Sequence, residues 1–202
     1  MSNWTHGYNP TFQKIFNLWF KNQKVGRLLD VGCADGSFCI PLVEMGWECY
    51  GVDKEKQKMV VDMPVEIADV ESEKLPFNND FFDVVFAGEI IEHLRDPKFF
   101  LGEVKRVLKE NGVFILTTPN VVYLRDRIRV LFGKRQVALE MPFHYRGYTF
   151  NSIEEILKEN GFVVEERRGS YFLKSTLPFA YKISDIYPKL LSTQVILKVR
   201  KC

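Results

Sequence analysis

Short apolar runs, separated by turn residues, recur along this chain and predict the strands of a buried sheet. Three runs are mostly apolar: residues 28–31, residues 81–87 and residues 113–117. Runs of this kind are typical of strands that are buried on both faces. Weaker runs predict further strands at residues 48–52, 65–68, 162–165 and 194–199.

Between these runs, apolar residues recur at the spacing of a helix face. Helices are predicted at Thr11–Lys21, at Ser37–Met45 and at residues 54–61. A fourth helix is predicted from Pro97, capped by Asp96, to a stop at residues 109–112. A fifth is predicted from Asn151, with Glu154 in a capping-box pattern, to a stop at residues 158–161. Both stops read Lys-Glu-Asn-Gly, which we interpret as convergent capping and not as an internal repeat. Strands that alternate with helices predict an α/β fold with a doubly wound, mostly parallel sheet.

Length and composition indicate one globular domain over residues 1–202, with 46% apolar and 27% charged residues. A net charge of +2 gives no strong overall attraction to polyanions. The four cysteines form no CxxC pair, so a reducing, cytoplasmic location is expected. We expect neither a secretion signal nor a transmembrane segment, because no apolar run approaches about 20 residues.

The stretch from Arg27 to Lys54 carries the strongest functional signal. It predicts a strand, a glycine turn, a helix and a second strand that ends at Asp53. A carboxylate there can accept hydrogen bonds from the two vicinal hydroxyls of a ribose. The dinucleotide fingerprint needs glycines at its first, third and sixth places, which hold Gly32, Ala34 and Ser37. A nucleoside cofactor without a pyrophosphate fits better, and a dehydrogenase is the weakest alternative.

The segments DVGCADG and GVDK resemble motifs I and II of the class I S-adenosylmethionine-dependent methyltransferases, and the similarity continues over roughly residues 26–165. The resemblance, which is to small-molecule enzymes such as those of ubiquinone biosynthesis, implies a Rossmann-like sheet of seven strands in the order 3-2-1-4-5-7-6 with an antiparallel last strand. It implies S-adenosyl-L-methionine as the cofactor. The implied binding residues are Asp30, Gly32, Ala34 and Gly36 on the methionine side, Asp53 at the ribose, and Asp69 and Val70 at the adenine. Cys33, Lys54 and Gly88 are further implied cofactor-binding residues. A simple turn role for Asp69 is the alternative.

Catalytic candidates follow the fourth strand. Methyl transfer requires positioning and, for some acceptors, removal of a proton. We expect His93, His144 and Glu89 in these roles, and a packed or capping His93 is the alternative. No metal is expected in the first interpretation. As an alternative, Glu89, Glu92 and His93 form an ExxEH pattern on one helical face that, with His144, resembles metal-dependent branches among ubiquinone-biosynthesis and small-RNA 3′-end methyltransferases.

Insertions at residues 119–149 and 169–192 are expected on the substrate side. Residues 1–25 are expected to form a helical flap, whose helix either closes the cofactor pocket or packs on the sheet, and residues 1–9 are either a loose terminus or a cover over the active site. In residues 121–135 an apolar helix face accompanies five basic residues and one acidic residue. A solvated face of a packed helix, an anionic substrate, an acidic lipid surface and RNA all remain open. The apolar residues of 170–192 predict either a lid over the acceptor or packing on the sheet edge.

The sequence therefore predicts a methyltransferase that acts on an oxygen or carbon atom of a small, partly apolar acceptor. The amino-methylating signature Asn-Pro-Pro-aromatic is absent after the fourth strand, where Ala87, Gly88 and Glu89 stand. An RNA methyltransferase that uses the basic helix is one alternative. A non-catalytic binding module with this fold is the other. Contact with a membrane surface is compatible with each of them.

Overall fold

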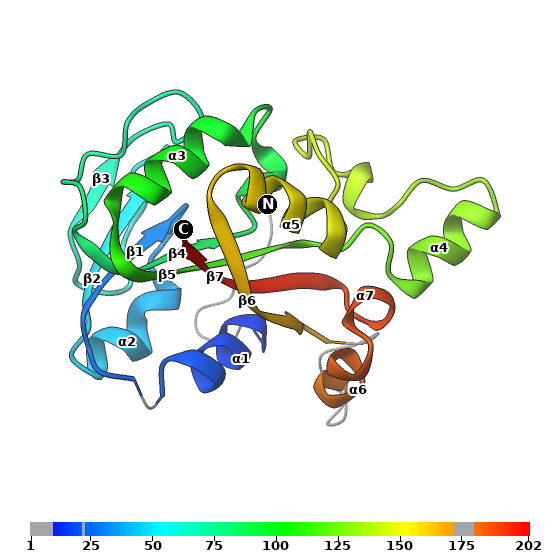
Figure 1. Ribbon diagram of the computed structural model, residues 1–202, viewed down its shortest axis with the longest axis horizontal. Helices are drawn as coiled ribbons and strands as arrows, with labels where there is room; N and C mark the ends of the chain where they lie inside the picture. Colours follow the sequence, from blue (N-terminus) through cyan, green and yellow to red (C-terminus); the bar gives the residue numbers. More distant parts are fainter. Residues whose placement is uncertain (1–9, 22, 172–179) are drawn as a thin grey trace.

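The computed structural model describes residues 10–21, 23–171 and 180–202, and it contains one seven-stranded sheet (Figure 1). The strand order is β3-β2-β1-β4-β5-β7-β6. The strands are β1 (Arg27–Val31), β2 (Glu48–Asp53), β3 (Val65–Ile67), β4 (Phe82–Gly88), β5 (Leu108–Pro119), β6 (Phe162–Gly169) and β7 (Gln194–Lys201). Pairing is parallel from β3 to β5, whereas β7 is antiparallel to β5 and β6. The predicted fold class and strand order are confirmed.

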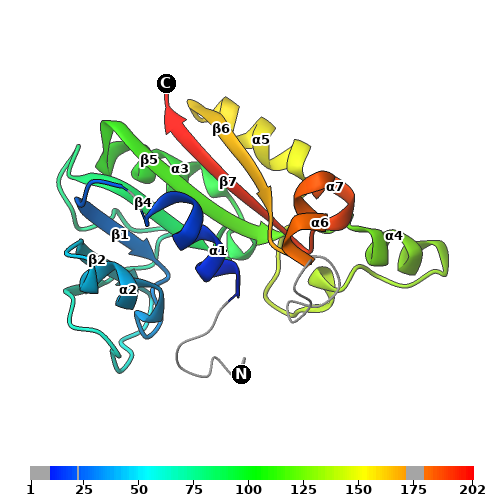
Figure 2. The same cartoon turned by 90° about the horizontal axis from the view of Figure 1, so that it is seen from below.

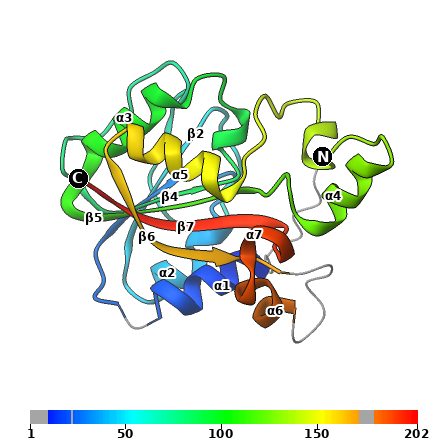
Figure 3. The same ribbon diagram turned by 45° about the vertical axis from the view of Figure 1, so that its right-hand side comes forward.

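Helices cover both faces of the sheet, with α3 and α5 on one face and α1 and α2 on the other (Figures 1 and 3). The helices are α1 (Pro10–Trp19), α2 (Ile40–Glu44), α3 (Pro97–Val107), α4 (Leu124–Leu131), α5 (Phe150–Glu159), α6 (Ala180–Ile186) and α7 (Pro188–Leu191), with 3-10 turns η1 (Ser37–Cys39), η2 (Ile91–His93) and η3 (Ala138–Glu140). Among the described residues, no helix combines the length and apolar character that crossing a bilayer requires. Residues 1–9 of the expected flap and residues 172–179 of the second insertion lie outside the described residues.

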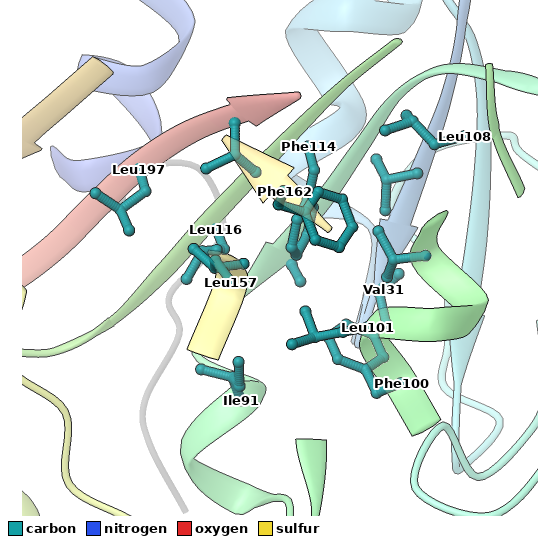
Figure 4. Close-up of a cluster of buried hydrophobic side chains, with 14 of the residues drawn as sticks. Val31, Ile91, Phe100, Leu101, Leu108, Phe114, Leu116, Leu157, Phe162 and Leu197 are labelled. Carbon is teal, nitrogen blue, oxygen red and sulfur yellow. The ribbon is translucent and has the colours of Figure 1, made fainter. Parts of the chain in front are cut away.

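Side-chain alternation along the strands produces two hydrophobic cores. Val31 belongs to the core on the α3 and α5 face, together with Phe100 and Leu157 (Figure 4). Leu28 belongs to the opposite core, together with Ile15 of α1. Complete burial of such a side chain contributes about 1.5–3 kcal/mol, so both faces stabilise the sheet.

An aromatic cluster fixes α1 against the start of the fold. The rings of Phe38 and Phe86 stack with their centroids 3.9 Å apart, and the Phe12 ring of α1 meets both rings edge-on. Phe38 lies in η1, directly after the glycine turn. The helical part of the expected N-terminal flap is therefore packed beside that turn.

The first predicted Lys-Glu-Asn-Gly stop is wrong. The helix α3 ends at Val107, and residues 109–112 lie inside β5. β5 pairs with β4 at Leu108 and again from Val113, so sheet pairing takes the intervening residues into an irregular part of the strand. The second stop is confirmed, because α5 ends at Glu159 and Gly161 follows with φ +77°.

Three other helix predictions need correction. Residues 54–61 form no helix, because the Val60 N–H donates to the carbonyl of Asp35 at 2.9 Å and holds this segment across the glycine turn. The cap of α5 is Thr149 and not Asn151. Thr149 accepts from the Ser152 N–H, and the Ser152 hydroxyl accepts from the Thr149 N–H, so this pair forms the capping box in place of Glu154. The predicted helix at Ser37–Met45 is divided into η1 and α2.

Candidate active site

The glycine turn joins β1 to η1 beside the carboxyl end of β2. The Gly32 N–H donates to the carbonyl of Val52 at 2.8 Å. Gly32, Ala34 and Gly36 have φ values of +69°, +47° and +79°, in the left-handed region that glycine adopts without strain. The Ala34 N–H donates to Oδ2 of Asp53 at 2.9 Å. The turn and the acid predicted to bind the ribose are thus directly hydrogen-bonded.

The ends of β2 and β3 are joined by an ion pair between Lys54 and Asp69, with 2.9 Å between Nζ and Oδ2. The hydrogen bond from Lys54 lowers the pKa of Asp69 and raises the pKa of Lys54. Oδ1 of Asp69 also accepts the N–H of Glu71 at 3.1 Å, so Asp69 does make the turn bond considered as an alternative. Its adenine-binding role remains a prediction.

Two of the predicted cofactor-binding residues, Asp30 and Cys33, are buried. The side chain of Asp30 lies 3.8 Å from the Cys39 thiol, and Asp30 is only 3% exposed. Burial raises the pKa of Asp30 to about 8. Cys33 is also buried, and burial raises the pKa of its thiol to about 12. We therefore expect Asp30 and Cys33 to shape the site through the backbone and not through direct side-chain contacts.

Space around the remaining predicted cofactor residues is tight. A Cβ atom on Gly36 would lie 2.6 Å from Cε of Met59, and one on Gly88 would lie 2.8 Å from the Phe86 ring. Val70 is half-buried and packs against the core on the α3 and α5 face. Gly36, Val70 and Gly88 lie near the carboxyl ends of β1, β3 and β4, and so they share the edge of the sheet that these strand ends form.

Glu89 follows β4 in a strained conformation. Its φ is +58°, which is unusual for a residue other than glycine. Thr117 of β5 donates its hydroxyl hydrogen to Oε1 of Glu89 at 2.8 Å. Burial raises the pKa of the Glu89 carboxyl. The Glu89 carboxyl group is thus held at the same sheet edge as the glycine turn.

Glu92, His93 and His144 come together next to this edge, with one ligand-type atom of each within 4.8 Å of the others. The two imidazole rings meet edge-on, with centroids 4.7 Å apart. The N–H groups of Tyr145 and Arg146 donate to the carbonyl of Glu92 at 2.9 and 3.2 Å. These backbone bonds bring the segment around His144 against η2 from about 50 residues away in the chain.

This cluster contains polar atoms without partners among the described residues. They are Oε1 of Glu92 and Nδ1 of His144, both of them buried. Burial and the charge of Glu89 raise the pKa of Glu92, and Thr118 donates to its Oε2 at 3.0 Å. Burial and the nearby His93 lower the pKa of His144. A carboxylate with two imidazoles is a ligand set that fits a divalent cation. The single helical face predicted for Glu89, Glu92 and His93 is absent, because η2 is only a 3-10 turn. Glu89 lies outside the group of possible ligands.

Residues 4–167 match the family described as a methyltransferase domain. A Mycolicibacterium smegmatis protein named as an S-adenosylmethionine-dependent methyltransferase is 29% identical over 170 residues, which cover 77% of this chain and 63% of that protein. A ubiquinone biosynthesis O-methyltransferase of Sinorhizobium medicae is 27% identical over 158 residues, which cover 72% and 63% of the two chains. The fold matches a SAM-dependent methyltransferase of Archaeoglobus fulgidus with a TM-score of 0.66 at 18% identity, covering 94% of this chain and 92% of that one.

This chain belongs to the class I S-adenosylmethionine-dependent methyltransferase family. The family match spans most of the chain and includes the glycine turn, Asp53, Asp69 and the Glu92–His93 pair. The aligned part of the chain spans 63% of the length of each of the two curated relatives.

Sequence reasoning missed several residues that shape the site of this methyltransferase family member. A Cβ atom on Gly32 would lie 2.1 Å from Cδ1 of Ile90, so the Ile90 side chain faces the glycine turn. Thr117 and Thr118 donate to the carboxyl groups of Glu89 and Glu92. Tyr148 is buried near Glu92, and its hydroxyl has no hydrogen-bond partner among the described residues. The only signal in the sequence was polar Thr-Thr at the end of an apolar strand.

Proposed function

We propose that this protein transfers the methyl group of S-adenosyl-L-methionine to an oxygen or carbon atom of a small, partly apolar acceptor. The observation that carries the proposal is the hydrogen bond of 2.9 Å between the Ala34 N–H and Asp53. It puts a ribose-type carboxylate beside a left-handed glycine turn, where open α/β sheets bind nucleotides. The names of the relatives support the same activity.

Two acids and the glycine turn would hold the cofactor. Asp53 would accept hydrogen bonds from both ribose hydroxyls, since its two carboxylate oxygens offer enough lone pairs. Asp69 and the backbone beside Val70 would contact the adenine. The backbone at Gly32 and Gly36, which carries no Cβ atom, would contact the methionine part of the cofactor. The buried Asp30 would support the turn from within the protein.

Exposed apolar residues beside His144 support a partly apolar acceptor. Met141, Phe143 and Tyr145 are 55%, 68% and 51% exposed, and they flank His144 in the chain. The missing Asn-Pro-Pro-aromatic signature argues against nucleobase or glutamine amide nitrogen. The name of the Sinorhizobium medicae relative, an O-methyltransferase, favours a hydroxyl acceptor.

His144 is the best candidate base. Its lowered pKa keeps the imidazole neutral near pH 7, so His144 can accept the proton of an acceptor hydroxyl as the new carbon–oxygen bond forms. His93 is oriented by the bond of 2.9 Å between its Nδ1 and the carbonyl of Phe143. Glu89 remains the third predicted catalytic residue, directly after β4.

A divalent cation held by Glu92, His93 and His144 is a second possibility for this cluster, supported by the two unpartnered buried atoms. A cation bound there would supply Lewis-acid polarisation of an acceptor oxygen. In that case His93 and His144 would act as ligands, and the proton would leave to solvent or to Glu89.

The activity is tested with two measurements. S-adenosylhomocysteine at about 100 times its dissociation constant should stabilise the protein by roughly 2.7 kcal/mol, seen as a thermal shift. Cell extracts incubated with the protein and an isotopically labelled methyl donor should yield a labelled product by mass spectrometry. A thermal shift without any labelled product would indicate a non-catalytic binding module. Absence of both would refute the proposed function.

A further inference from the structure

The helix α4 and the loop after it extend away from the sheet (Figures 1 and 2). The sequence predicted an apolar face on this helix, which would normally be covered by the body of the protein. Only the beginning of that face is buried: Val121 is 7% exposed, whereas Ile128 is 47% exposed. The remainder of the face points away from the two cores.

We call residues 128–135 the α4 tip. Leu131 and Phe132 are its most exposed members, with 83% and 78% of their surfaces accessible, and Val130 is 48% exposed. A single exposed leucine is common, but adjacent leucine and phenylalanine side chains exposed to this degree are not. The α4 tip therefore exposes three consecutive apolar side chains, those of Val130, Leu131 and Phe132.

Basic residues surround this apolar surface. Arg125, Arg127, Lys134 and Arg135 are all exposed, and no ion pair holds any of the four within the described part of the chain. The one acid of residues 121–135, Asp126, is buried and pairs with Arg129. The positive charge near the α4 tip is thus not neutralised locally.

The protruding shape is held by specific contacts. Nε of Arg129 donates to the carbonyl of Arg135 at 3.0 Å, and its guanidinium also pairs with Glu140. Oδ1 of Asp126 accepts the N–H of Val137 at 3.2 Å. These bonds fold the loop back against α4, and they leave Leu131 and Phe132 at the outer end.

We propose that the α4 tip binds the surface of an anionic lipid bilayer. Leu131 and Phe132 would enter the boundary between headgroups and acyl chains, while Lys134 and Arg135 would contact lipid phosphates. RNA would use the charges but gains little from protruding aliphatic groups, and a small anionic acceptor would not need so large an apolar surface. This binding goes beyond the proposed methyl transfer and does not depend on it.

The test is flotation of the whole chain with vesicles of phosphatidylcholine that contain phosphatidylglycerol, compared with vesicles of phosphatidylcholine alone. We expect binding to the anionic vesicles only, and weaker binding as salt increases. The double variant Leu131→Ser/Phe132→Ser should reduce the partition coefficient by about tenfold or more. Lys134→Ser/Arg135→Ser should reduce it by roughly 10- to 30-fold and flatten the salt dependence.

Val163→Ser/Ile67→Ser is the matched control, because those apolar residues are 55% and 52% exposed on β6 and β3. The control should bind like the parent, and all variants should keep the parent's affinity for S-adenosylhomocysteine. Phe132→Trp gives a second readout, since its emission should shift to shorter wavelength with anionic vesicles.

Three outcomes would overturn the proposal. The first is no binding to anionic vesicles, or an equal loss in the control variant. The second is salt-dependent binding to polyuridylate that the Leu131→Ser/Phe132→Ser variant retains, which would identify RNA as the ligand. The third is a dimer in solution that the same variant dissociates, because a second copy would then cover the α4 tip.

Discussion

The backbone N–H of Ala34 donates to the carboxylate of Asp53 at 2.9 Å, across the ends of the two adjacent parallel strands β1 and β2. Ala34 reaches this position because its φ is +47°. The other carboxylate oxygen accepts the N–H of Glu55 at 3.2 Å. The acid is therefore held in one orientation before any ligand arrives, which reduces the entropic cost of binding.

Asp53 accepts the N–H of Ala34 and is proposed to bind the ribose, and two substitutions should separate these roles. Asp53→Ala removes the carboxylate, and each lost charge-assisted hydrogen bond to a ribose should cost about 1.5–3 kcal/mol. We expect the dissociation constant of S-adenosylhomocysteine, measured by calorimetry, to rise by at least about tenfold. Asp53→Asn keeps an acceptor for Ala34 and should lose less affinity. Asp62→Ala, at an exposed acid nearby, is the control. Unchanged affinity in Asp53→Ala would argue against the ribose assignment.

The fold could be predicted from sequence because its signals are local and agree with one another. The apolar runs of β1, β4 and β5 need burial on both faces, and the glycine turn needs left-handed residues at Gly32 and Gly36. The two Lys-Glu-Asn-Gly stops show the limit of local signals. The same four residues end α5 but lie within β5 at residues 109–112, because strand pairing is decided by distant partners.

The candidate site could be predicted only in part, for the same reason. Asp53 and Asp69 could be placed at the carboxyl ends of neighbouring strands, because each stands at the end of a predicted apolar run. The distance from His144 to His93 could not be derived, since it depends on backbone bonds from Tyr145 and Arg146 to Glu92. The exposure of Leu131 was also hidden, because helical periodicity shows that a face is apolar but not whether anything covers it.

Removing a ligand-type atom tests the cation hypothesis at Glu92, His93 and His144. Manganese should bind the parent with a stoichiometry of one by calorimetry, and Glu92→Gln should weaken that binding by roughly 10- to 100-fold or more. Glu71→Gln, at a half-buried acid beyond the cluster, should bind like the parent. S-adenosylhomocysteine affinity should be unchanged in Glu92→Gln. If manganese does not bind the parent, the cluster holds no such cation, and His144 keeps the role of base.

Asp30 should make folding stability depend on pH. Burial raises its pKa from 3.8 to about 8 in the folded protein, so the folded state binds the proton more tightly than the unfolded state. The stabilisation is complete below about pH 4 and is lost as the pH rises through about 8. Asp30→Asn mimics the protonated carboxyl at every pH. The variant should therefore gain stability relative to the parent as the pH rises through this range.

Chemical denaturation at several pH values measures that difference in the free energy of unfolding. Asp62→Asn, at an exposed acid, should follow the parent throughout. A constant difference between Asp30→Asn and the parent at all pH values would show that Asp30 titrates normally and is not shielded from solvent.

Two glycines should respond in opposite ways to alanine. Gly32 has φ +69°, and a Cβ there would lie 2.1 Å from Cδ1 of Ile90. Gly32→Ala should lose about 1–2 kcal/mol from backbone strain alone, and more from the contact. Adding Ile90→Ala removes both atoms that the new Cβ would meet, Cδ1 at 2.1 Å and Cγ1 at 2.9 Å, and compared with Ile90→Ala alone it should recover only the contact part. Gly102 lies inside α3, and a Cβ atom there would meet no neighbouring atom within 4 Å, so Gly102→Ala should stabilise the protein by about 0.4–1 kcal/mol.

The free energies of unfolding of these variants, from urea titrations, decide between two explanations of the glycine turn. If Gly32→Ala lost stability and Ile90→Ala restored none of it, the backbone conformation alone would require glycine at this position. Full recovery in the double variant would instead assign the requirement to the Ile90 side chain. A Gly32→Ala variant as stable as the parent would contradict both explanations, because it would mean that the turn can adopt another conformation. The position of Asp53 would then not depend on the conformation of Gly32.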